Sequence, residues 1–129
     1  MDKNVKIFVS VIVLLFVLVG GLFLLNKSTT PTGPGKYDEF ATCLKDKGAV
    51  FFGAFWCTHC QAQKKLFGTS QRLLPYVECS TPDAKGQTQE CIDKGVVSYP
   101  TWRFTDGSEL KGEIPLAQLA EKTSCVLPQ

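Results

Sequence analysis

The chain has 129 residues, enough for one small domain, and a formal net charge of +2. That excess lies near the N-terminus, because residues 36–129 carry eleven basic and eleven acidic side chains. A neutral domain without a basic cluster argues against a nucleic-acid partner. Six cysteines in so short a chain favour disulfides and an oxidising compartment.

The N-terminal part of the chain is strongly apolar. Residues 7–25 contain no charge and no proline over 19 positions, close to the ~20 residues that cross a bilayer as a helix. They predict a retained membrane anchor after a short cytoplasmic segment, residues 1–6. A cleaved signal peptide is the alternative, but this run exceeds a usual signal-peptide core and no A-x-A-like cleavage site follows it.

Charges around this span indicate its orientation. Lys3 and Lys6 precede the span, and only Lys27 follows it closely. The positive-inside bias therefore favours a cytoplasmic N-terminus. We expect a single-pass protein of the cell membrane, with its C-terminal domain in the periplasm, a lumen or the cell exterior.

A polar segment of residues 26–36, NKSTTPTGPGK, predicts a linker to a domain over residues 37–129. The alternation of elements in that domain predicts an α/β fold with helices on both faces of a mixed, largely parallel sheet. In chain order we expect a helix over 37–48, a buried strand over 49–56, a helix over 58–70, a strand over 73–79, a short helix over 89–95, a hairpin over 99–114 and a helix over 115–126.

Cys57 and Cys60 lie where the first strand of the domain gives way to a helix. At that position the unpaired backbone N–H groups and the helix dipole favour thiolate over thiol, and the thiolate is the nucleophile. Cys60 follows one helical turn later on the same side. The first cysteine can therefore attack a substrate disulfide and the second can resolve the mixed disulfide. The spacing predicts a redox-active pair.

A zinc site and haem attachment are two other possible uses of the cysteines. Zinc could take Cys57, Cys60, Cys79 and Cys91, but a zinc ribbon usually repeats the tight Cys-x-x-Cys spacing, which Cys91 lacks. Haem attachment needs a histidine directly after the second cysteine, where this chain has Gln61. We expect no metal and no cofactor. A non-catalytic, disulfide-stapled interaction domain is the remaining alternative.

The segment FWCTHC, followed some forty residues later by YPT, resembles the thioredoxin superfamily. The chain is more similar still to the thioredoxin-like domains that accompany bacterial vitamin K epoxide reductase homologues, as fused modules or separate partners. The resemblance implies a thioredoxin-like fold for the whole domain. It is carried by FWCTHCQAQKKLFG, LPYVECSTPD, QECIDKGVVSYPTWRFTDG and LAQLAEKTSC, which span most of residues 37–126.

This resemblance implies roles for individual residues. Cys57 would be the exposed nucleophile and Cys60 the buried resolving thiol. Pro100 would be a cis-proline facing the active site, an uncommon isomer in proteins. Tyr99 and Thr101 would help to hold substrate backbone beside Cys57.

The residues next to the cysteines add two expectations. A histidine at the position of His59 resembles the oxidising members of the superfamily, protein disulfide isomerase and the periplasmic oxidases. Near Cys57 it would stabilise the thiolate and raise the reduction potential above that of thioredoxin. The alternative is a solvated histidine with little influence. Trp56 is expected to border the active site.

The chain also departs from ordinary thioredoxins at two positions. Six residues before the first cysteine, thioredoxins have a buried acid that helps to deprotonate the resolving thiol; here the residue is Phe51. Five residues after the second cysteine they have a helix-kinking proline; here the residue is Lys65. These departures count against the reductase behaviour of cytosolic thioredoxins and leave open how the Cys60 proton leaves.

Four cysteines remain for structural bridges. Pairing Cys79 with Cys91 would close a loop of about thirteen residues, worth on the order of 3 kcal/mol in the chain-entropy model. The related domains carry a similar additional pair, which is either structural or relays electrons; we expect a structural bridge. Cys43 and Cys125 are then left to join the first and last helices of the domain.

The predicted function is that of a membrane-anchored thiol–disulfide oxidoreductase that exchanges disulfides with extracytoplasmic proteins through Cys57 and Cys60. The resemblance implies re-oxidation by a membrane-embedded, quinone-linked partner of the vitamin K epoxide reductase or DsbB type. Disulfide isomerase and reductant remain as alternatives of the same fold.

Overall fold

The computed structural model of the chain describes residues 2–25 and 33–129, in two compact units, Met1–Thr32 and Gly33–Gln129. Most of the expected linker, and Lys27 with it, lies outside the described residues. Residues 33–36 belong to the second unit, where the Gly35 backbone N–H donates to the Asp38 carboxylate at 3.0 Å. The domain therefore starts slightly before the expected residue 37.

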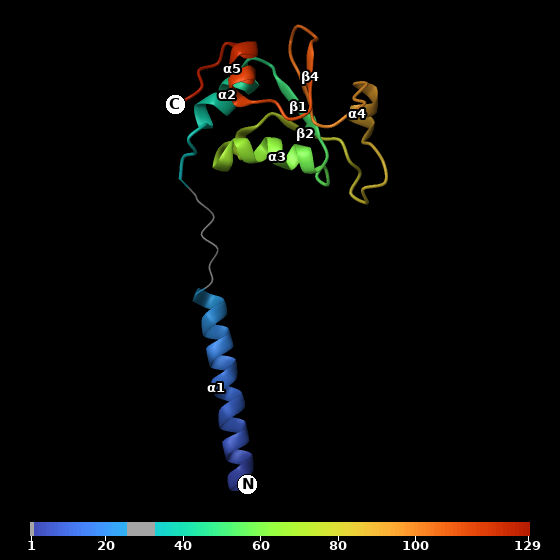
Figure 1. Cartoon of the computed structure of the whole chain (residues 1–129). Coiled ribbons are helices and arrows are strands. Elements are labelled where there is room, and N and C mark those ends of the chain that lie inside the picture. Colours follow the sequence, from blue (N-terminus) through green and yellow to red (C-terminus); the bar gives the residue numbers. More distant parts are fainter. Residues whose placement is uncertain (1, 26–32) are drawn as a thin grey trace. The chain divides into compact units, whose positions relative to one another are not determined.

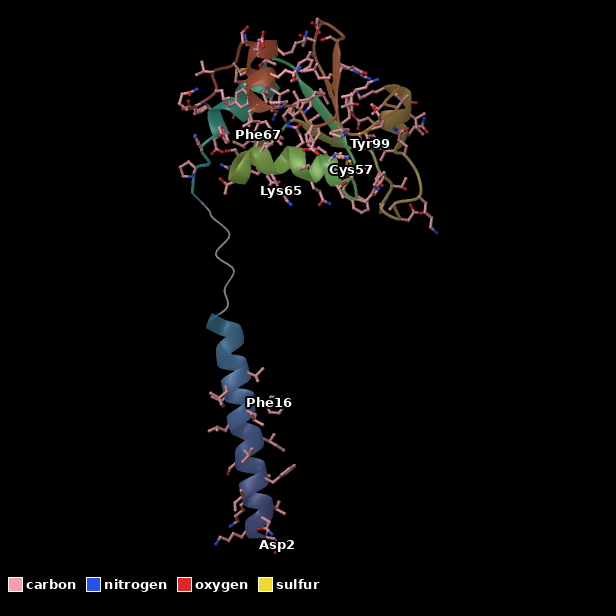
Figure 2. The ribbon with its side chains drawn as sticks, viewed as in Figure 1. Asp2, Phe16, Cys57, Lys65, Phe67 and Tyr99 are labelled. Carbon is pink, nitrogen blue, oxygen red and sulfur yellow. A yellow bond between two sulfur atoms is a disulfide. The ribbon has the colours of Figure 1, made fainter. Side chains whose placement is uncertain are left out.

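The first unit contains the helix α1, Lys3–Leu25 (Figure 1). Its segment Lys3–Gly21 has a mean hydropathy of 2.3 and is long and apolar enough to cross a membrane. Large apolar side chains such as Phe16 are exposed along it (Figure 2). Both a signal sequence and a membrane anchor have these properties.

The second unit is built on a four-stranded sheet with the order β2–β1–β3–β4. Only β1 and β2 run parallel; β3 is antiparallel to both β1 and β4. The expectation of a mixed sheet is confirmed, but the expectation of a largely parallel one was wrong, because β3 lies between β1 and β4 and runs opposite to both. The strands are β1 Val50–Gly53, β2 Tyr76–Glu78, β3 Thr101–Arg103 and β4 Glu109–Lys111.

Five helical segments surround the sheet, and their order follows the sequence expectation. Each α-helix of the domain is shorter than expected, and the 3-10 helix was not predicted. The largest shift of a single end is in α3, which ends at Leu66 instead of Ser70, because Gly68 takes the left-handed φ of +55° and a 3-10 turn follows. The helices are α2 Asp38–Asp46, α3 Thr58–Leu66, the 3-10 helix η1 Gly68–Leu73, α4 Gln89–Asp93 and α5 Leu116–Thr123 (Figure 1).

Two hydrophobic cores lie on opposite faces of the sheet. Successive strand residues point to opposite faces, and accordingly Phe51 and Phe52 of β1 enter different cores. The larger core stacks Phe51 on Trp102, with ring centroids 4.8 Å apart, beneath α2, α3 and α5. The smaller core packs Phe52 against Cys79, Cys91 and Val96 beside α4. Helices thus cover both faces, as expected for a thioredoxin-like α/β domain.

Each core includes cysteines of one disulfide. Cys43 of α2 is bonded to Cys125, directly after α5, and so joins the first and last helices of the domain. Cys79, directly after β2, is bonded to Cys91 of α4. The second bridge encloses the polar loop that precedes α4.

Candidate active site

The free thiols Cys57 and Cys60 lie at the start of α3. Cys57 is the N-cap residue, and its extended backbone conformation turns the side chain back over the first helical turn. The Cys60 backbone N–H donates to the Cys57 sulfur at 3.3 Å. Figure 2 shows Cys57 at the end of α3 that faces Tyr99, with Lys65 and Phe67 at the opposite end. The geometry suits a pair that closes a disulfide within one helical turn.

Cys57 is more enclosed than the resemblance implies. Cys60 has 1 % of its surface exposed, as expected for a resolving thiol, but Cys57 has only 8 %. The reason is its capping role, which directs the sulfur to the helix N-terminus. The neighbouring aromatic side chains Phe55 and Trp56 are half exposed. A reacting disulfide must therefore approach across an aromatic rim.

Cys60 differs chemically from its partner. Burial raises the pKa of the Cys60 thiol to about 12, and interaction with Cys57 adds to the rise, whereas a hydrogen bond to the Ala54 backbone and, more weakly, the charge of Lys64 oppose it. The Cys60 thiol is consequently protonated at neutral pH. Each exchange in which Cys60 attacks or departs must move a proton on or off this buried sulfur.

His59 does not bond to either cysteine. Its Nδ1 lies 2.6 Å from Oε1 of Glu113, and its side chain is 71 % exposed. Sequence reasoning named His59 but missed Glu113, which lies 54 residues further along the chain with no local signal to connect the two. A carboxylate therefore fixes the imidazole beside the helix N-terminus.

The Tyr99–Pro100–Thr101 segment lies at the start of β3, and its Tyr99–Pro100 peptide bond is cis. Tyr99 is half-buried; its hydroxyl accepts from the Gln87 amide at 2.7 Å. Thr101 is 1 % exposed, and its hydroxyl donates to the Ser98 carbonyl at 2.8 Å. Any contact of Thr101 with a substrate must therefore come from its backbone, because the side chain points inward.

A groove of about 420 Å³ adjoins the cysteine pair on the side of Trp56. The Trp56 indole N–H donates to the Ser80 hydroxyl at 2.8 Å, and its ring packs edge-on to Tyr99 at 6.2 Å. One wall is the polar loop enclosed by the Cys79–Cys91 bridge. The groove is lined by Trp56, Ala84, Lys85, Gly86, Gln87, Val96, Val97 and Tyr99.

A second group of residues that the sequence did not single out lies beneath the pair, on β2. Glu78 Oε1 accepts from the backbone N–H groups of Phe55 and Ser80, and its Oε2 accepts from the Tyr76 hydroxyl at 2.8 Å. Residues two apart on a strand share a face, a signal that could have paired Tyr76 with Glu78. The carboxylate braces the loop that leads to Cys57.

The arrangement leaves no thiolate set for zinc. Two of the four possible zinc ligands, Cys79 and Cys91, are bonded to each other and fully buried. Within residues 2–25 and 33–129, no group of three or more His, Cys, Asp or Glu side chains is placed to hold a metal ion. The chemistry at hand is that of two thiols.

Comparison with known proteins agrees with this chemistry. The thiol-disulfide oxidoreductase LTO1 of Arabidopsis thaliana is 43% identical to the chain over 90 residues, which cover 67% of this chain. The matched segment makes up 24% of LTO1, so the chain spans about a quarter of the length of that relative. No protein-family model matches the chain.

Proposed function

We propose that the protein is a thiol–disulfide oxidoreductase that works through Cys57 and Cys60. The observation that carries the proposal is the pair of free thiols at the N-terminus of α3, linked by a hydrogen bond from the Cys60 backbone to the Cys57 sulfur. The other four cysteines are consumed in disulfides. The similarity to LTO1, whose name states this activity, supports the same conclusion.

The exchange proceeds in two displacements. In the oxidising direction a substrate thiolate attacks Cys57 of the Cys57–Cys60 disulfide, a mixed disulfide forms, and Cys60 leaves as a thiolate that takes up a proton. A second substrate thiolate then attacks the substrate sulfur bound to Cys57 and releases the Cys57 thiolate. The substrate loses two electrons and gains a disulfide; the enzyme gains both electrons as two thiols.

Residues around the cysteine pair would bind the substrate and adjust the reduction potential of the pair. Trp56 and Tyr99 form one end of the adjoining groove, and backbone atoms of Pro100 and Thr101 are proposed to align an extended substrate beside Cys57. His59, held by Glu113, is proposed to raise the reduction potential of the pair, which favours oxidation of substrates. Isomerase and reductant activities remain the alternatives.

The chain is proposed to act at a membrane. The apolar helix α1 fits an anchor, and the positive residues before it favour a domain outside the cytoplasm. Extracytoplasmic proteins would be the substrates. The resemblance to domains that accompany vitamin K epoxide reductase homologues supports a membrane-embedded, quinone-linked partner that re-oxidises the pair.

A redox titration against glutathione, combined with trapping, tests the proposal. The Cys60→Ala variant should accumulate mixed disulfides with protein substrates through Cys57, because the resolving thiol is gone, and the Cys57→Ala variant should accumulate none. The titration should give a potential above that of thioredoxin, about −270 mV. A potential at or below that value would identify a reductant, and absence of trapped species would refute exchange through this pair.

A further inference from the structure

Lys64 occupies an unusual position for a lysine. It lies four residues after Cys60 on α3, so both side chains share one face of the helix. Its ammonium lies over the Tyr76 ring, 3.3 Å from the centroid, within the range of a cation–π interaction. Burial lowers the pKa of Lys64, while the charges of Glu78 and Cys60 oppose that change. The Lys64 ammonium is therefore partly withdrawn from solvent.

The Tyr76 ring also lies near the Cys60 sulfur. A Cβ atom placed on Gly53 of β1 would lie 2.9 Å from Tyr76 Cε2 and 3.0 Å from the Cys60 sulfur. Because Gly53 has no side chain, the Tyr76 ring and the Cys60 sulfur can both pack over this position of β1. The Tyr76 hydroxyl is fixed by Glu78, its partner at 2.8 Å. Tyr76 thus lies under the Lys64 ammonium and close to the Cys60 sulfur.

We propose that the Lys64 ammonium, positioned by Tyr76 and Glu78, is the charge that stabilises the Cys60 thiolate during disulfide exchange. This inference rests on the proposed function and names the group that acts on the resolving thiol. Where thioredoxins have their buried acid, this chain has Phe51, which is fully buried against Trp102 and carries no charge. Lys64 acts on the same sulfur from the helix side.

The chemistry follows from the two displacements. When Cys60 resolves a mixed disulfide, its proton passes to solvent and its thiolate attacks the Cys57 sulfur; the Cys57–Cys60 bond forms and the other sulfur leaves with the bonding electron pair. In the opposite direction Cys60 is the leaving group and takes a proton afterwards. Both directions pass through a charged Cys60, so a nearby cation lowers the barrier in each.

The other groups that face Cys60 cannot supply this charge. Besides Lys64, the groups that interact with the Cys60 thiol are Cys57, the Ala54 backbone and the hydroxyls of Tyr76 and Tyr99, none of which can carry a positive charge, so Lys64 is the cation among them. Lys65, the next residue on α3, is exposed. This pair of lysines provides a matched comparison.

The test is a two-phase reaction of the reduced, full-length protein in detergent with dithiodipyridine, an uncharged aromatic disulfide. In the first phase Cys57 attacks and releases one thiopyridone; in the second Cys60 attacks Cys57 and releases another. Stopped-flow absorbance resolves both phases, and Cys60→Ala, which lacks the second, assigns them. Lys64→Met is compared with Lys65→Met, which removes the same charge from a solvated site.

Lys64→Met should slow the second phase about threefold to tenfold, because each pKa unit added to Cys60 costs roughly threefold once its greater nucleophilicity is counted. Lys65→Met should leave the phase unchanged, and Lys64→Arg, which keeps the charge, should restore most of the rate. The reduction potential at neutral pH should not move in Lys64→Met, since Cys60 is protonated with or without the lysine. If Lys64 only supported the fold, its replacement would not slow the second phase while leaving the reduction potential unchanged.

Equal second-phase rates in the wild type and Lys64→Met, or equal slowing by Lys65→Met, would overturn the inference while leaving the proposed function intact. A wild-type protein that releases no thiopyridone in the first phase would instead overturn the proposed function. Should Lys64→Met not fold, Lys64→Gln, which also removes the charge, serves in its place with the same expected slowing of the second phase.

Discussion

The buried side chain of Gln63 is bonded at both ends to the backbone of Ile114. Its amide nitrogen donates to the Ile114 carbonyl at 3.0 Å, and its carbonyl oxygen accepts from the Ile114 N–H at 2.6 Å. Gln63 lies on α3 between the cysteine pair and Lys64, and Ile114 follows Glu113, the partner of His59. One amide thus ties the active-site helix to the segment that orients the histidine.

Replacing Gln63 with Leu should destabilise the domain strongly. The substitution leaves the Ile114 N–H and carbonyl buried without partners, at a cost of about 1–3 kcal/mol for each such group. We expect a loss of about 2–4 kcal/mol in the free energy of unfolding, measured by urea denaturation. Gln118→Leu, on the exposed side of α5, is the control and should change stability by less than about 0.5 kcal/mol. Similar losses in the two variants would contradict the role of the amide.

The Cys79–Cys91 bridge should act as a staple and not as an electron relay. Both sulfurs belong to fully buried residues, so an incoming thiolate has no path to them. The double variant Cys79→Ala, Cys91→Ala should lose about 3 kcal/mol of stability in the chain-entropy model yet oxidise a reduced test peptide at the wild-type rate. A folded double variant whose isolated Cys57–Cys60 pair reacts normally but whose catalytic turnover stops would show that the bridge carries electrons.

His59 should contribute to the reduction potential. The proposed interaction with the Cys57 thiolate favours the reduced pair, so His59→Ala should lower the potential by on the order of 30 mV, a tenfold change in the equilibrium with glutathione. Thr58→Ala, the neighbouring exposed substitution between the cysteines, is the control. If both variants keep the wild-type potential in the glutathione titration, His59 is only a solvated partner of Glu113.

The pairing of Asp38 with Arg72 should make stability depend on pH. Two bonds of 2.8 and 2.6 Å from the guanidinium, together with the Gly35 N–H, hold the pKa of Asp38 well below its usual range. Because the folded-state pKa is depressed, the stabilisation is present above the unfolded value, about 3.9, and fades as the pH falls below it. Asp38→Asn should therefore lower the melting temperature at pH 7 and lower it by a clearly smaller amount at pH 2, where part of the stabilisation has already been lost.

Glu39→Gln is the matched control for this prediction, since Glu39 is an exposed acid in the same helical turn with only the helix dipole to stabilise it. Its melting temperature should stay close to that of the wild type across the pH range. A gap between Asp38→Asn and the wild type that persists unchanged at pH 2 would mean that the lost stability does not come from ionisation of Asp38.

Local patterns in the sequence sufficed for much of this architecture. The junction at Cys57, the short helix around Cys91 and the hairpin turn at Asp106 and Gly107 each depend on residues within a few positions. The errors had two sources. The end of α3 depends on Gly68, a nearby residue whose left-handed conformation helical periodicity does not register. The strand directions depend on how β3 pairs with β1, which is not a local property of the sequence.

The site shows the same division. The cysteine pair is visible in the sequence because its spacing is set by one helical turn. Glu113 and Glu78 are not, since each reaches the site from an element distant along the chain, and a surface carboxylate has many possible partners. Thr101 illustrates a further limit: a residue in a recognisable segment can point inward, which only the register of β3 decides.

Glu78 holds the Ser80 N–H, and Ser80 in turn holds the Trp56 indole. The aromatic rim over the reactive sulfur is therefore anchored one residue beyond the cysteine that closes the polar loop. Changes in the length or composition of the polar loop will therefore shift Trp56 at the entrance to the Cys57 thiol. The loop offers a place to alter which molecules reach Cys57 without changing the reacting atoms.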